Sequence, residues 1–338
     1  MDSDSRQNRY SRHILLDEVG SAGQRKFVDS RVAVVGCGAL GTVAAGLLAR
    51  SGIGFIRVID RDVVEWSNLQ RQVLFVEGDI GLPKADAAAR RLRELNSEIR
   101  IEPLILDLDA TNVEESIRGM TLVVDGTDNI RTRMRLNDAC VKNRIPWVYA
   151  GVVRTGGMVM AVRPGGPCLR CLLPEPPPPA SLLTCDRAGV LNSAAEAVGA
   201  LAFTTAVHIL LGVMPFSGLL HIDVWEPSLE RVTVEKNPEC ECCGRGRYPF
   251  LQPGEEDRVT SFCGRNSVQI IPARPGSVDF DSLTADLEKA GRVRRGDDML
   301  IFAADDFEIT VFRDGRAIIR GTEEIAKAQA LYARYLGQ

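Results

Sequence analysis

The stretch Val32-Ala-Val-Val-Gly36-Cys-Gly38-Ala-Leu-Gly41 decides the fold of this 338-residue chain. Its first four residues are apolar and predict a buried strand, and the GxGxxG spacing that follows is typical of a tight turn leading into a helix. Glycines in such a turn let phosphate oxygens approach the backbone, and the helix N-terminus adds free N–H groups with a partial positive charge. The stretch therefore predicts nucleotide binding.

Strands and helices are expected to alternate on both sides of this turn. Apolar, strand-like runs occur at residues 31–35, 55–60, 99–106, 121–125 and from residue 147. Helical patterns occur at residues 9–30, 39–51, 84–96 and 131–142. This alternation predicts an α/β fold, with a Rossmann-like, mostly parallel sheet that carries helices on both faces.

The rest of the chain is expected to extend this sheet and then to form a second, smaller domain. Strand-like runs at residues 158–163, 221–225 and 231–235 belong to the first part, with the last two predicted to pair antiparallel. We expect a nucleotide-binding domain over residues 1–248, a polar linker over 249–259, and a small C-terminal α+β domain over 260–338. In that small domain, strands are predicted at 267–271, 299–302, 307–312 and 317–319, and helices near 281–290 and 323–336.

Two segments of the first domain have unusual compositions. Residues 174–179 contain five prolines, which exclude a helix or a central strand and predict a loop. Residues 194–211 are apolar but contain Glu196 and His208, so we expect a buried helix rather than a membrane span. The capping-box pattern over residues 193–196 predicts that this helix begins near Asn192.

The composition limits the class of partner and the compartment. A net charge of −4 and a pI near 5.6 argue against nucleic acid as the main partner. Residues 1–8 lack the apolar core of an export signal, so a cytoplasmic location is expected. The nine cysteines then favour metal binding or chemistry over disulfides, because clustered thiols stay reduced there.

Asp60 supports the nucleotide reading of the glycine turn. It ends the second predicted strand, 19 residues after Gly41, where a carboxylate that binds ribose belongs. These features alone are equally typical of a nicotinamide or flavin dehydrogenase.

Charged residues further along favour a reaction that expels pyrophosphate from ATP. Ser67-Asn-Leu-Gln-Arg71 and Lys84 follow the second strand, and cations there would neutralise charge that develops on departing phosphates. Asp125-Gly-Thr-Asp128-Asn129 ends the fourth strand, at the sheet edge where ligands bind. Asp128 is a candidate ligand of Mg²⁺, which prefers oxygen ligands and phosphates.

The motifs together resemble those of a known superfamily, in order and at sensible spacing. They are Arg9-Tyr-Ser-Arg12, Gly36-Cys-Gly-Ala-Leu-Gly41, Asp60, Ser67-Asn-Leu-Gln-Arg71, Gly81-Leu-Pro-Lys84 and Thr127-Asp-Asn129. Over residues 8–248 the chain is similar to the ThiF/MoeB superfamily of ubiquitin-activating-enzyme-like adenylyltransferases. One departure is Ala39, where that family commonly has glycine.

The resemblance implies roles for particular residues. It implies ATP contacts from Gly38, Ala39, Asp60, Asn68, Arg71, Lys84 and Asn129, with Asp128 at Mg²⁺. It also implies that Arg12 reaches into the partner's site across a homodimer, as an arginine finger would.

Two CxxC pairs, Cys168-Leu-Arg-Cys171 and Cys240-Glu-Cys-Cys243, predict a structural zinc site. Four thiolates satisfy tetrahedral Zn²⁺ and leave no open position for water. Cys242 leaves a shifted pairing open, whereas the resemblance supports Cys240 and Cys243.

Cys185 follows the proline-rich run and is a candidate nucleophile, with Arg187 as a nearby cation. In relatives, the matching loop cysteine forms a thioester or a persulfide-linked intermediate, whereas other members only adenylate. Cys37 and Cys140 are expected to be packing residues. Cys263 is either a relay thiol or structural, and the segment after residue 260 is too short for us to assign a rhodanese activity.

These features predict that the chain adenylates the C-terminal glycine carboxylate of a ubiquitin-like or sulfur-carrier protein. Cys185 would then capture the acyl group or deliver sulfur. The alternatives are adenylation of a small molecule or a tRNA base by the same fold, a non-catalytic scaffold that binds ubiquitin-like proteins, and a nicotinamide dehydrogenase.

Overall fold

The computed structural model describes residues 9–175, 188–213, 216, 218–252, 259–262, 266–271, 278–304 and 306–336. It divides into two compact units, Met1–Gln252 and Pro253–Gln338. The division falls within the expected linker at residues 249–259.

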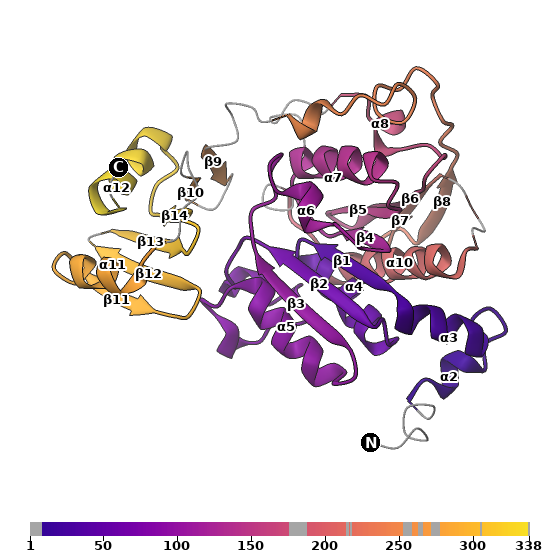
Figure 1. Ribbon diagram of the computed structural model, residues 1–338, viewed down its shortest axis with the longest axis horizontal. Coiled ribbons are helices and arrows are strands. Elements are labelled where there is room, and N and C mark those ends of the chain that lie inside the picture. The colour runs from indigo at the N-terminus through magenta and orange to yellow at the C-terminus, as the bar shows by residue number, and fades with distance from the viewer. Residues whose placement is uncertain are drawn as a thin grey trace. The chain divides into compact units, whose positions relative to one another are not determined.

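The first unit is built on one eight-stranded sheet, in the order β3-β2-β1-β4-β5-β6-β7-β8 (Figure 1). The strands are β1 (Arg31–Val35), β2 (Phe55–Asp60), β3 (Arg100–Ile105), β4 (Leu122–Asp125), β5 (Trp147–Val153), β6 (Gly156–Val162), β7 (Leu219–Asp223) and β8 (Ser228–Val232). The first five pair in parallel, and the last three add antiparallel. The predicted mostly parallel sheet is therefore confirmed.

Helices cover both faces of this sheet, as the alternation predicts. They are α2 (Ser11–Ile14), α3 (Gly20–Asp29), α4 (Ala39–Arg50), α5 (Lys84–Leu95), α6 (Val113–Ser116), α7 (Ile130–Lys142), α8 (Leu169–Leu172) and α10 (Asn192–Leu211), with 3₁₀ turns η1 (Trp66–Asn68), η2 (Glu77–Asp79) and η4 (Pro249–Leu251). In β1, Val32 and Val34 join a core with α4, α5 and α10, whereas Ala33 and Val35 join a core with α6 and α7. Every second side chain of a central strand thus faces the same helical layer.

Helix α10 is long and apolar enough to cross a membrane by length and composition alone. Its small residues, such as Ala195, Val198 and Ala202, are instead buried in the core beside the sheet. A Cβ on Gly199 would lie 2.7 Å from Cβ of Val43, so α10 and α4 are in close contact. The prediction of a core helix is therefore confirmed for the face of α10 that packs against the sheet and α4.

The predicted capping box at residues 193–196 is wrong. Leu191 is the N-cap of α10 and makes no side-chain cap. Oδ1 of Asn192 accepts a hydrogen bond from the Ser193 N–H at 2.9 Å, so a side chain inside the first turn takes up one of its free N–H groups.

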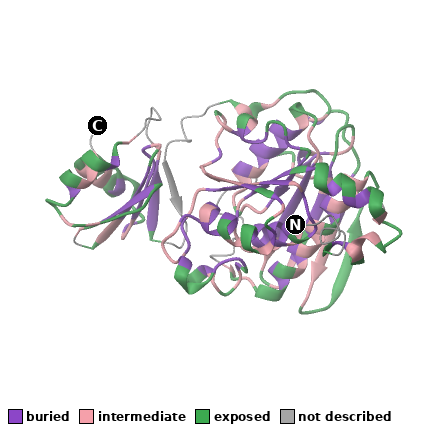
Figure 2. Ribbon diagram, turned by 60° about the horizontal axis from the view of Figure 1, so that its bottom comes forward, coloured by how far each residue is buried: buried purple, intermediate pink, exposed green. Residues whose placement is uncertain are grey.

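The second unit has an antiparallel six-stranded sheet in the order β11-β12-β13-β14-β10-β9. Its elements are β9 (Val259–Phe262), β10 (Ser267–Ile270), α11 (Phe280–Leu287), β11 (Arg292–Arg295), β12 (Met299–Ala304), β13 (Phe307–Phe312), β14 (Ala317–Arg320) and α12 (Ile325–Leu336). Buried apolar residues of β10, β12, β13 and β14 form its core with residues of both helices (Figure 2). Strand β11 escaped sequence analysis because Arg-Val-Arg-Arg at a sheet edge has little apolar content.

Candidate functional site

The glycine turn connects β1 to α4, as the quoted stretch predicts. Gly36 has φ of +83°, which favours glycine, and its N–H donates to the carbonyl of Ile59 at 2.8 Å. A Cβ on Gly41 would lie 1.8 Å from the carbonyl oxygen of Gly36, and a Cβ on Gly126 would lie 2.4 Å from the same oxygen. Gly126 therefore must be glycine for the loop after β4 to pack on the turn, a requirement that sequence analysis missed.

Helix α4 begins at Ala39, with Gly38 as its N-cap. Among the residues that the structure describes, no side chain caps this helix end, so its first-turn N–H groups can bind an anionic ligand. Alanine at the first helical position keeps this region small, and the departure from the family's usual glycine leaves the helix start intact.

Asp60 ends β2 directly beside this turn. Its carboxylate accepts hydrogen bonds from the N–H of Cys37 at 2.6 Å and from the N–H of Asp62 at 2.7 Å. Burial raises the pKa of Asp60, and nearby Lys84 opposes that rise. The carboxylate is thus fixed at the turn, where the sequence placed a ribose-binding acid.

A group of buried and half-buried charges lies at the carboxyl ends of β2 and β3. Lys84, the first residue of α5, is 3 % exposed, and its Nζ lies 3.3 Å from Oδ2 of Asp62. Nη1 of Arg61 donates to Oδ1 of Asp107 at 3.1 Å. Burial alone would lower the pKa of Arg61, but the carboxylates of Asp107, Asp62 and Asp128 raise it. Asp128 therefore belongs to the same electrostatic group as Arg61.

Asn68 and Arg71 lie on the short segment between β2 and α5. Asn68 is buried, and its Oδ1 accepts a hydrogen bond from the Glu65 N–H at 3.0 Å. Nη1 of half-buried Arg71 donates to the Ser67 carbonyl at 2.6 Å. Their positions are thus set by hydrogen bonds within this segment.

The loop after β4 is braced by Arg133, which sequence analysis did not single out. Nε of Arg133 donates to Oδ2 of the fully buried Asp125 at 3.0 Å, and its Nη2 donates to the carbonyls of Thr127 and Ala150. Oδ1 of Asp125 accepts from the N–H and hydroxyl of Thr127 at 2.8 and 2.6 Å. Asp128 also contributes to raising the pKa of Arg133, although burial opposes this. The carboxylate of Asp128 is thus near both Arg61, which follows β2, and Arg133 of α7.

Asn129 is the N-cap of α7. Its Oδ1 accepts from the N–H groups of Arg131 at 2.8 Å and Thr132 at 3.4 Å. This oxygen is occupied by helix capping, so the amide nitrogen is the group left for a ligand.

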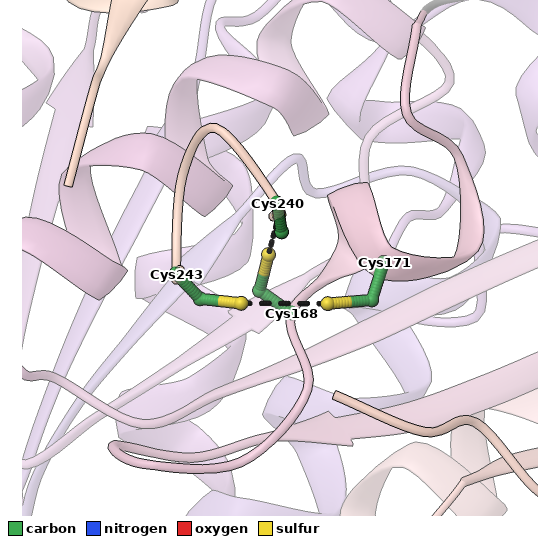
Figure 3. Close-up of side chains that lie close together, drawn as sticks. All are labelled: Cys168, Cys171, Cys240 and Cys243. Carbon is green, nitrogen blue, oxygen red and sulfur yellow. Dashed lines mark hydrogen bonds between the residues drawn. The ribbon is translucent and has the colours of Figure 1, made fainter. Parts of the chain in front are cut away.

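The four predicted zinc ligands converge in a second site (Figure 3). The sulfurs of Cys168, Cys171, Cys240 and Cys243 all lie within 4.8 Å of one another. Sγ of Cys168 lies 3.7 Å from Sγ of Cys240, and Sγ of Cys171 lies 3.4 Å from Sγ of Cys243. Tetrahedral zinc with Zn–S bonds of about 2.3 Å needs sulfurs about 3.8 Å apart. The four thiols therefore fit a structural zinc ion.

Cys242 lies outside this set of four. It is fully buried, and its sulfur accepts a hydrogen bond from Nδ2 of Asn137 at 3.3 Å. A hydrogen bond with Cys242 is also the main cause that lowers the pKa of Cys168, to about 4, which favours the thiolate. The geometry therefore supports Cys240 and Cys243 as the second pair.

Helix α7 extends from the first site to the second. At its C-terminal end, Oδ1 of Asn137 accepts from the Leu169 N–H at 2.9 Å, and Oδ2 of Asp138 accepts from the Phe250 N–H at 3.2 Å. Both contacts order segments that carry or follow the cysteines. The same helix therefore supports the Asp125 loop and the cysteine cluster.

Of the remaining candidates, only Cys37 contacts a site in the described structure, through its backbone N–H, which donates to Asp60. Cys37 and Cys140 are fully buried and burial raises the pKa of both, which confirms them as packing residues. Arg12 lies exposed on α2. Cys185 and Cys263 lie outside the described residues, as does most of the proline-rich run.

Comparisons with known proteins agree with this arrangement. The model of the ThiF family matches residues 10–242. The sulfur carrier protein ThiS adenylyltransferase of Bacillus subtilis is 40 % identical over 335 residues, 97 % of this chain and 99 % of that protein. The SAMP-activating enzyme E1 of Haloferax volcanii is 43 % identical over 247 residues, 72 % of this chain and 92 % of that protein.

A solved structure of Escherichia coli MccB with ATP has the same fold. It superposes with a TM-score of 0.61 at 25 % identity, covering 72 % of this chain and 77 % of MccB.

Proposed function

The chain belongs to the ThiF family, and from this premise we propose that it uses ATP to adenylate the C-terminal carboxylate of a ubiquitin-like sulfur-carrier protein. The proposal draws its substrate from the relatives that are named for activating ThiS and SAMP. The observation that carries it is the group of cations and carboxylates around the glycine turn, with Asp60 and Lys84 buried, which a dehydrogenase does not need.

The triphosphate would lie over the turn at Gly36, Gly38, Ala39 and Gly41, where the α4 N–H groups point. Asp60 would bind the ribose. Asn68, Arg71 and Lys84 would bind the phosphates, with Lys84 exchanging Asp62 for a phosphate oxygen. The oxygen of Asn129 caps α7, so its amide nitrogen would be the group that donates to the nucleotide.

Mg²⁺ is the cofactor that this chemistry implies, and it would neutralise negative charge on the phosphates. Asp128 would hold it, since the loop braced by Arg133 places this carboxylate at the carboxyl edge of the sheet.

The reaction needs positioning and charge neutralisation more than acid–base groups. A carboxylate oxygen of the carrier's last glycine would attack the α-phosphorus. The bond from that phosphorus to the β-phosphate oxygen would break, giving an acyl-adenylate and pyrophosphate. Lys84 and Arg71 would stabilise the charge that gathers on the departing pyrophosphate.

Arg12 is proposed to act on the partner's site in a homodimer. The neighbouring Tyr10 is held away from the glycine turn of its own chain. Its hydroxyl accepts a hydrogen bond from Nδ2 of Asn96 at 2.8 Å, and its ring packs on Gly52. Gly52 and Asn96 precede β2 and β3, so α2 lies at the edge of the sheet opposite to the turn. A six-residue strand such as β2 is about 20 Å long, beyond the reach of an arginine.

Zinc would be held by Cys168, Cys171, Cys240 and Cys243. It would tie the segment after β6 to the segment after β8 and would have no open position for a substrate. After adenylation, the Cys185 thiolate is proposed to attack the acyl carbon, which forms a thioester as the bond to AMP breaks. Delivery of sulfur would instead require that Cys185 first carry a persulfide supplied by a sulfur donor, whose outer sulfur attacks the acyl carbon and displaces AMP. A cytoplasmic location fits thiols that must stay reduced.

ATP–pyrophosphate exchange tests the function. Label from pyrophosphate should enter ATP only when a carrier with a C-terminal Gly-Gly is present, and a carrier that lacks its last glycine is the control. Cys185→Ala should keep this exchange, because adenylation precedes the cysteine step. Exchange that is independent of any carrier would instead favour a small-molecule substrate, and no ATP binding would favour a scaffold.

A further inference from the structure

Gln72 has a feature that neither the motifs nor the core explain. It follows Arg71 in the segment between β2 and α5, and its side chain is 3 % exposed. Among the described residues, its Oε1 is buried and has no hydrogen-bond partner. Burying an amide oxygen without a partner costs stability, so such a group in a native structure calls for an explanation.

The other end of the same amide faces the glycine turn. Nε2 of Gln72 lies 4.0 Å from the point that a Cβ on Gly38 would occupy. Gly38 is the N-cap of α4, where the uncapped N–H groups and the helix dipole favour an anion. An NH₂ group at this position adds a donor directed to the same place.

The backbone holds Gln72 firmly in this position. Its N–H donates to the Asn68 carbonyl at 3.0 Å, and its carbonyl accepts from the Phe75 N–H at 3.1 Å. The side chain is therefore placed by the turn and by packing rather than by hydrogen bonds of its own. An apolar residue of the same length would fill this space without leaving a buried oxygen unpaired.

We propose that Gln72 binds the nucleotide directly, with its side-chain NH₂ donating a hydrogen bond to a non-bridging oxygen of the ATP triphosphate at Gly38. The unpaired Oε1 is the stability cost of keeping this donor at the site, a pattern expected of functional positions. This inference rests on the proposed use of ATP and adds a contact that the sequence motifs do not assign.

The test uses Gln72→Met, which keeps the length of the side chain and removes both polar atoms. Gln70→Met is the matched control, because Gln70 lies two residues earlier and is exposed. Binding of ATP with Mg²⁺ is measured by calorimetry on the full chain, and thermal unfolding is measured without nucleotide. No carrier protein is needed, so the result does not depend on the identity of the substrate.

Gln72→Met should weaken ATP binding roughly tenfold, the value of one hydrogen bond to a charged group. The nucleotide-free variant should unfold at the same temperature as the wild type or at a higher one, because a buried unpaired oxygen is gone. Gln72→Glu should weaken binding further, since a carboxylate repels phosphate, and Gln70→Met should bind like the wild type.

Two results would overturn the inference. One is unchanged ATP affinity in Gln72→Met. The other is a loss of affinity accompanied by a lower unfolding temperature, because Gln72 would then be a structural residue. If the wild type binds ATP but shows no carrier-dependent exchange, the proposed substrate is refuted. The ATP affinities of Gln72→Met and the wild type would still decide the inference about Gln72.

Discussion

Arg133 donates a hydrogen bond from Nε to Oδ2 of Asp125, with 3.0 Å between the two atoms and no solvent at the carboxylate. The same guanidinium binds the carbonyls of Thr127 and Ala150. One side chain from α7 thus joins the end of β4 to the middle of β5 and fixes the loop that carries Asp128.

Replacing Arg133 by methionine should be strongly destabilising. It would leave the Asp125 carboxylate buried without its cation, which costs about 3–5 kcal/mol in the free energy of unfolding. Urea unfolding at neutral pH measures this. Arg118→Met is the control, because Arg118 pairs with Glu115 on an exposed surface and its loss should change stability by less than about 0.5 kcal/mol.

The destabilisation by Arg133→Met should depend on pH. Burial raises the pKa of Asp125 in the folded protein, and Arg133 opposes this rise. Without Arg133, the pKa of Asp125 in the folded protein lies further above its value in the unfolded chain. The destabilisation is therefore present above that folded-state pKa and disappears as the Asp125 carboxyl takes up a proton. The difference from the wild type should therefore shrink as the pH falls through the raised pKa of Asp125. A difference that stays constant would contradict this assignment.

Gly126→Ala should disrupt the site through the backbone. The new Cβ would lie 2.4 Å from the Gly36 carbonyl oxygen, and no side chain can move aside to relieve that contact. We expect a loss of about 1–3 kcal/mol in unfolding free energy and weaker ATP binding. Gly78→Ala, with no atom within 4 Å of its Cβ, should leave both properties unchanged.

The cysteine cluster should hold one zinc ion per chain, measured by elemental analysis of purified protein. Cys240→Ser and Cys243→Ser should lose the metal and lower the unfolding temperature, because two loops are no longer tied. Cys242→Ser should retain the metal, since its sulfur binds Asn137 instead of completing the set of four. Metal loss in Cys242→Ser alone would show that the pairing is shifted.

Arg12→Ala and Lys84→Ala should each lose carrier-dependent exchange, and their mixture should recover it. In a mixed dimer, one site keeps Lys84 and receives Arg12 from the other chain. Random reassortment into C₂ dimers should restore roughly a quarter of wild-type activity. If the mixture stays inactive although subunits exchange, Arg12 does not act across the dimer.

Much of the first unit could be predicted because its signals are local. The apolar run from Val32, the glycines of the turn and the charged helix from Lys84 each specify an element within a few residues. The wrong capping box shows the limit of such signals, since Ser193 and Glu196 have the right spacing but Asn192 is already inside the helix. The roles of the predicted site residues, among them Arg12, Cys185 and Asp128, remain predictions.

By itself, the sequence determined the strand–turn–helix order, the acid at the end of β2, the cations that follow it and the two CxxC pairs. Those features depend on residue type and spacing along the chain. Only the tertiary structure decided that Arg133 neutralises Asp125, that Gly126 must lack a Cβ and that Gln72 faces Gly38. The physical reason is that the contacts of Gly126 and Gln72 join segments 90 and 34 residues apart, which no local pattern links. Arg133 lies only 8 residues from Asp125, but the burial that makes their pairing matter exists only after the sheet has formed.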